Sequence, residues 1–152
     1  MTGSTSRYLL FVLVVGLTAC SSRSVDTELT RCVFPDSART PAPSFICGAE
    51  VSGFPVTALR SSEPSEQDIA ERIDRVLQSQ IEQWSIQWST QWFGSEQQQL
   101  AFEFLRDWLS DNARVVRSRV SPKSTLWLLI GQPMTLADLE QLTKNQTSPA
   151  AK

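Results

Sequence analysis

The segment QWSIQWSTQW, residues 83–92, carries three of the five tryptophans of this 152-residue chain at intervals of four. Within the segment alone, polar and nonpolar residues alternate as they would in a strand. Upstream, the alternation breaks at residues 81–82, whereas apolar residues continue at helical spacing back to residue 69. On a helix these residues form one stripe: Ile69, Ile73, Val76, Leu77, Ile81, Trp84, Trp88 and Trp92. We therefore predict one long amphipathic helix that ends with the third tryptophan.

Capping signals delimit this helix and predict a second one. Ser65, with Asp68 three residues later, is typical of a helix amino terminus. After a break at Gly94, Ser95 and Gln98 fit a capping box, and apolar residues recur at helical spacing as far as Asn112. The chain should therefore contain two consecutive helices joined by a very short turn.

Three strands and a last short helix complete the predicted fold. Residues 56–61, 115–120 and 125–130 have strand character, and the proline turn at 121–124 joins the last two into a hairpin. Thr135, with a carboxylate three residues later, predicts a short final helix. The order is β-α-α-β-β-α. We predict an α+β domain in which a small three-stranded antiparallel sheet packs against a long helix pair.

The first twenty residues, MTGSTSRYLLFVLVVGLTAC, have the layout of a secretory signal peptide. A single cation precedes an apolar run, which at residues 8–19 is shorter than the ~20 residues that a membrane-spanning helix needs. The ending Leu-Thr-Ala-Cys at 17–20 resembles the lipobox of bacterial lipoproteins. This resemblance implies that Cys20 is lipidated and becomes the first residue of a mature chain anchored to the membrane. Ser21, rather than aspartate, favours the outer membrane by the same resemblance.

Cys32 and Cys47 remain as a pair once Cys20 is assigned to lipidation. They enclose 14 residues rich in proline, and a secreted protein passes through an oxidising compartment. A metal site is the alternative, but two thiols without histidine would need two further ligands. We predict a disulfide that closes an amino-terminal loop.

The sequence around these cysteines resembles the opening of the LPP-twenty family of small bacterial outer-membrane lipoproteins. The match is carried by CVFPDSARTPAPSFIC, in which the Cys-x-Phe-Pro-Asp start and the Ala-Pro before the second cysteine are the specific parts. The resemblance extends by pattern to about residue 131, although the helices here are rich in Gln and Trp rather than Ala. It implies a lipid-anchored envelope protein, and some members of this family are tied to flagellar structures. The expected organisation is a signal peptide at 1–19, a tether at 20–31, the α+β domain at 32–143 and a disordered tail at 144–152.

The composition argues against most enzymatic chemistry. The chain contains no histidine, which removes the commonest general base and the commonest metal ligand. The paired acids Glu71 and Asp74 lie beside Arg72 and Arg75, as on an ordinary solvated helix face. The net charge of −2 gives no electrostatic reason to expect nucleic acid binding. We predict no catalytic residues, no metal site and no cofactor.

The tryptophan cluster and the charge distribution are the candidate interaction features. Trp84, Trp88 and Trp92 are either core residues facing the sheet or, where a small sheet cannot cover a long helix, a candidate interface with a protein partner or a second copy. Residues 63–82 carry six acids and two arginines, whereas residues 112–134 carry four cations and no acid. These two segments could be solvated surfaces or complementary patches between subunits.

The expected function is a non-enzymatic structural or interaction module of the cell envelope, held at the outer membrane through Cys20 and facing the periplasm or the cell surface. Self-association and a flagellar association are both compatible with it. The alternative is a periplasmic assembly factor or ligand-binding lipoprotein that acts on cell-wall or export clients.

Overall fold

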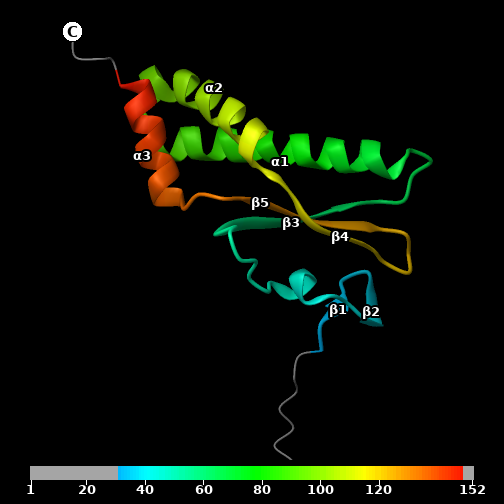
Figure 1. The fold of residues 1–152 in the computed structure, drawn as a ribbon. Helices are drawn as coiled ribbons and strands as arrows, with labels where there is room; N and C mark the ends of the chain where they lie inside the picture. Colours follow the sequence, from blue (N-terminus) through cyan, green and yellow to red (C-terminus); the bar gives the residue numbers. More distant parts are fainter. Residues whose placement is uncertain (1–30, 149–152) are drawn as a thin grey trace, which may run out of the picture. The chain divides into compact units, whose positions relative to one another are not determined.

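The computed structural model describes residues 31–148, and their order of elements confirms the predicted α+β class (Figure 1). The main sheet contains β3, β4 and β5, and a two-stranded ribbon, β1 and β2, precedes it. The strands are β1 (Val33–Phe34), β2 (Ser37–Pro41), β3 (Val56–Ser62), β4 (Arg114–Val120) and β5 (Leu126–Gln132). The helices are the 3₁₀ turn η1 (Ser44–Cys47), α1 (Ile69–Trp92), α2 (Ser95–Asn112) and α3 (Leu136–Thr147).

Strand β5 lies in the centre of the sheet and pairs antiparallel with β3 on one side and β4 on the other. Successive side chains of β5 point to opposite faces of the sheet, and both faces are covered. Ile130 belongs to the core beneath the helices, whereas Leu129 belongs to a second core beneath the amino-terminal segment. Gly131 allows Phe54 and Val116 to approach the strand, since a Cβ there would lie 2.8 Å from each of them. A strand buried on both faces reads as a nearly continuous apolar run, as LWLLIGQ does.

Helices α1 and α2 lie next to each other on one face of the sheet, and α3 packs against α2 (Figure 1). Their shared core contains Ile81, Trp84 and Trp88 from α1, together with leucines from the other two helices, Leu105, Leu109 and Leu139. Ser85 and Ser89 of α1 are almost completely buried, and their hydroxyls donate to backbone carbonyls of the preceding turn. Helix α1 is therefore enclosed over a wider arc than its apolar stripe alone predicts.

The amino-terminal segment, residues 31–54, covers the opposite face of the sheet (Figure 1). Phe34, Phe45 and Ile46 are buried there against Leu129 of β5. The hairpin of β1 and β2 and the turn η1 are too short to form a stable layer by themselves. They are held because their apolar side chains have a sheet face to pack on and because a disulfide closes the segment.

Two of the three predicted helix caps are wrong. Asp68, not Ser65, is the N-cap residue of α1, and the Ser65 hydroxyl instead accepts a hydrogen bond from the Gln67 N–H at 3.3 Å. At α2 the cap residue is Gly94, and the Gln98 side chain donates to Thr90 of α1 rather than completing a capping box. A side chain near a helix start can thus be used for local turns or helix–helix contacts instead of a cap.

The cap of α3 is confirmed, but the predicted end of the domain is too early. Thr135 accepts from the Asp138 N–H at 3.2 Å, and its hydroxyl donates to the Asp138 carboxylate at 2.6 Å. The helix then continues to Thr147, so residues 144–147 are helical rather than part of a disordered tail. Thr143 and Thr147 are buried and donate to carbonyls one turn earlier, which explains how a polar sequence stays packed. Among residues 31–148, no helix combines the length and apolarity needed to cross a bilayer.

Replacement of Trp88 by alanine should strongly destabilise the domain. Its side chain is 3% exposed, and truncating a buried aromatic residue costs about 3–5 kcal/mol. Denaturant unfolding should show this loss in the free energy of unfolding. Trp92→Ala is the matched control, since Trp92 is only half-buried at the end of the same stack and should cost clearly less. Equal losses at the two positions would contradict the assignment of Trp88 to the core.

Candidate functional site

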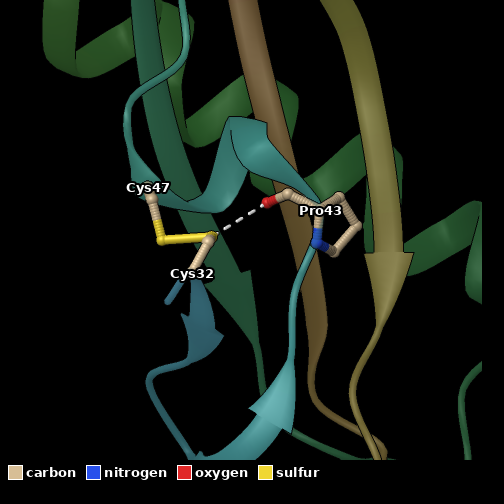
Figure 2. Close-up of a disulfide and its surroundings, with 3 residues drawn as sticks. All are labelled: Cys32, Pro43 and Cys47. Atoms are coloured by element: carbon tan, nitrogen blue, oxygen red, sulfur yellow. Dashed lines mark hydrogen bonds between the residues drawn. A yellow bond between two sulfur atoms is a disulfide. The ribbon is translucent and has the colours of Figure 1, made fainter. Parts of the chain in front are cut away.

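The predicted disulfide is present and closes the amino-terminal segment (Figure 2). Cys32 precedes β1 and Cys47 ends η1, with their Cα atoms 5.7 Å apart. The Cys32 sulfur also lies 3.2 Å from the Pro43 carbonyl oxygen, a polar contact rather than a conventional hydrogen bond because a disulfide sulfur carries no proton. Cys20, the predicted lipidation site, lies outside the described residues.

Asp36 connects the amino-terminal segment to the turn between β4 and β5. The Ser121 hydroxyl donates to its carboxylate across 85 residues of sequence. This hydrogen bond is the main cause that lowers the pKa of Asp36 below its ordinary value of 3.8, and hydrogen bonding from Thr125 and the charge of Lys123 act in the same direction. Partial burial opposes them by raising the pKa of the same group. The Asp of the Cys-x-Phe-Pro-Asp motif therefore has a structural role, which sequence reasoning did not assign.

The three tryptophans form one stacked column, but two of them are not at the surface. The ring centroids of Trp84 and Trp88 are 5.3 Å apart and those of Trp88 and Trp92 are 5.6 Å apart, with nearly parallel planes. Trp84 and Trp88 are 6% and 3% exposed, while Trp92 is half-buried. This corrects the candidate interface at Trp84 and Trp88, because α2 and α3 supply cover that the sheet alone could not.

The four cations of residues 112–134 lie on β4, which is an edge strand of the sheet, and in the turn after it. The Arg114 guanidinium lies 4.9 Å from the ring centroid of Phe54. Arg117 and Arg119 each line a hollow between β4 and the amino-terminal segment, with volumes of about 350 and 490 Å³. Neither forms a salt bridge with another residue of 31–148. Cations at these positions can protect a sheet edge from unwanted pairing.

A further hollow of about 220 Å³ lies where α1 crosses β3, and sequence reasoning missed it. Its most unusual member is Gln80, which is 1% exposed and has no hydrogen-bond partner for either atom of its side-chain amide within the described structure. The signal was available, because Gln80 lies four residues after Val76 and four before Trp84, inside the apolar stripe. Apolar packing alone does not explain why a polar side chain occupies the middle of an apolar stripe. The other lining residues are Arg60, Ser61, Arg75, Val76 and Ser79.

Comparison with protein-family models, with curated proteins and with solved structures finds no match for this chain. Within residues 31–148, no group of three or more Cys, Asp and Glu side chains is arranged to hold a metal ion.

Removal of the disulfide should lower the stability of the domain by about 3 kcal/mol, the chain-entropy value for a loop of this length. The test variant is Cys32→Ser with Cys47→Ser, compared with the parent chain by denaturant unfolding. Non-reducing mass mapping of the parent should show the two cysteine-containing peptides linked. Cys20→Ser, which lies outside the closed loop, is the control and should preserve both the link and the stability. Free thiols at both positions in secreted protein would contradict the bond.

The Asp36 contact predicts a specific dependence of stability on pH. Because its pKa is lowered in the folded state, the carboxylate stabilises the fold above its unfolded pKa, and this contribution disappears as pH falls through the folded pKa. Asp36→Asn should therefore be less stable than the parent near neutral pH, and the difference should shrink below about pH 4. Unfolding curves measured across this range give the comparison. Ser121→Ala should follow the same trend, and a difference that does not change with pH would exclude the carboxylate as its source.

Proposed function

We propose that this chain is a lipid-anchored protein of the bacterial cell envelope whose folded domain is a non-enzymatic interaction module. The observation that carries the proposal is the lipobox-like sequence ending at Cys20, followed within twelve residues by a disulfide-closed entry to the domain. A disulfide fits a protein that folds outside the cytoplasm. The resemblance of residues 32–47 to LPP-twenty lipoproteins supports the same class of protein.

The way the domain begins suits a membrane tether. Cys32 is held in the domain through the disulfide and through its carbonyl, which accepts from the Ala42 N–H at 2.9 Å. A pull transmitted along the tether would therefore reach a cross-linked loop before it reached a strand of the main sheet. The 11 residues between Cys20 and Cys32 span at most about 40 Å when fully extended. The domain would thus stay close to the surface of the bilayer that holds its anchor. We propose that this bilayer is the outer membrane.

Complementary charges support a protein partner, which includes a second copy of the chain. The first turns of α1 and the loop before it carry most of the acids of residues 63–82, and the cations of 112–134 lie on and beside β4. Electrostatic complementarity of this kind favours encounter and fixes the orientation of partners. The alternative, a ligand-binding lipoprotein, is favoured by one specific observation, the hollow beside Gln80.

Metabolic labelling with palmitate tests the anchor directly. The parent chain should incorporate label and sediment with membranes, because acylation at Cys20 supplies an anchor of several chains. Cys20→Ala should lose both properties. Cys47→Ala is the matched control, since it removes a cysteine without touching the lipobox and should retain the label. Label that persists in Cys20→Ala would refute the proposal.

A further inference from the structure

Three arginines of β4 project from the same face of the sheet. They are Arg114, Arg117 and Arg119, and they pair with residues 131, 129 and 127 of β5. The side chains at 127 and 129 pack against the amino-terminal segment. Because paired residues of neighbouring strands project to the same face, the three arginines lie on the side of this segment too. The irregular register before Arg117 is what brings Arg114 to this side, since regular alternation would turn the two to opposite faces.

The amino-terminal segment and the β4–β5 turn add further cations on this side. We call residues 31–54, β4 and the turn at 121–124 the basic layer. Besides the three arginines, this layer contains Arg31, Arg39 and Lys123, and all six cations are exposed. Its two acids are Glu50 and Asp36, and the latter is engaged in the hydrogen bond to the turn. None of the six cations forms a salt bridge with another residue of 31–148.

The helices on the other side of the sheet are acidic. Together α1, α2 and α3 contain nine acidic and four basic residues. One of these basic residues, Arg72, is buried and donates to the Ser62 carbonyl. The domain is therefore electrically polar, with positive charge on the side of the amino-terminal segment and negative charge on the side of the helices (Figure 1). Such a distribution orients a protein at a charged surface.

The cations of the basic layer are spread out rather than gathered around one pocket. From Arg114 to Arg119, β4 extends over roughly 15 Å, because a strand rises about 3.3 Å per residue. Arg117 and Arg119 line separate hollows, and Arg114 lies over the ring of Phe54. A single small anion can contact only one of these groups at a time. An extended negative surface can contact several of them at once.

The chain enters the domain in this same layer. The described part of the chain starts at Arg31, and 11 residues separate Cys32 from the proposed lipidation site at Cys20. These residues span at most about 40 Å. A bilayer that holds the anchor is therefore always within reach of the basic layer, at a high effective concentration.

We propose that the basic layer binds the anionic lipid headgroups of the bilayer that holds the anchor. Its exposed guanidinium and ammonium groups donate to lipid phosphates. The acidic helices then point away from the membrane, where they are accessible to a protein partner. This inference rests on the proposed lipid anchor for its setting, but the lipid-binding surface can be measured without the anchor.

Co-sedimentation of the chain from residue 21 onward with lipid vesicles tests this surface. This chain lacks the apolar residues 8–19, which would bind vesicles by themselves, and it retains both hydrophobic cores. A thermal unfolding transition, recorded first, establishes that it is folded. Vesicles of phosphatidylcholine mixed with phosphatidylglycerol should bind it at low salt and release it as salt screens the charges, whereas phosphatidylcholine alone should not bind it. Equal binding to both kinds of vesicle, or no binding at low salt, would overturn the proposal.

A pair of matched variants locates the surface. Arg117→Gln with Arg119→Gln should weaken binding to the anionic vesicles roughly 20-fold, since each cation near such a surface contributes about fivefold. Arg75→Gln with Arg106→Gln removes two exposed cations from α1 and α2, so it changes the net charge equally and should leave binding nearly unchanged. All four positions are exposed, and the melting temperature should stay the same in both variants. Equal losses of binding would mean that net charge, not the basic layer, is responsible.

Two further measurements separate lipid headgroups from other anions. Arg117→Lys with Arg119→Lys should keep most of the binding, because a headgroup surface attracts either cation, whereas a site shaped for paired hydrogen bonds to the carboxylates of an acidic protein requires arginine. Inorganic phosphate, added at the concentration of the lipid phosphate, should not release the chain from the vesicles. A lysine variant as weak as the glutamine variant would assign the layer to an acidic protein, and complete release by phosphate would assign it to a small anion. Either result would overturn the proposal.

Discussion

The central strand β5 has to be buried on both faces, and this constraint organises the rest of the domain. With β3 and β4 on its two sides, LWLLIGQ presents Ile130 to one face and Leu129 to the other. One face packs against the three helices, which contribute most of the residues of the larger core. The other recruits residues 31–54, which contain little regular structure. The domain is therefore a three-layer arrangement with one large core and one small core.

The small core explains why this segment needs a covalent bond. Phe34, Phe45 and Ile46 alone bury little apolar area compared with the entropy lost in ordering the segment around them. The Cys32–Cys47 bond reduces the entropy of the unfolded chain, and the Asp36–Ser121 hydrogen bond ties the same segment to the β4–β5 turn. The Cys-x-Phe-Pro-Asp motif and the second cysteine thus belong to the part of the chain that stabilises this second layer.

Periodicity in the sequence was sufficient for the order of elements from β3 to α3, but it did not predict the short β1, β2 and η1 or the environment of each element. The stripe from Ile69 to Trp92 predicted α1, and the apolar run at 125–130 predicted the strand β5, because both patterns reflect the repeat of the backbone in a helix or a strand. The exposure of Trp84 and Trp88 depends on where α2 and α3 pack. A local sequence pattern cannot predict that packing, because it involves residues far apart in the chain. The caps at Ser65 and Ser95 failed for a related reason, since several local hydrogen bonds compete for the same side chains.

Two equally buried glutamines show why Gln80 stands apart. Gln132 of β5 is 0% exposed, yet its amide oxygen accepts from the Met134 N–H and its amide nitrogen donates to the Met134 carbonyl. The fold therefore gives both the nitrogen and the oxygen of a buried glutamine a partner when the backbone offers a donor and an acceptor. Gln80 is 1% exposed, and within residues 31–148 neither its amide nitrogen nor its amide oxygen has a hydrogen-bond partner. The same side chain is thus paired with the backbone at one position and buried without a partner at the other, where the packing of α1 against the sheet has to offset the cost of the unpaired amide.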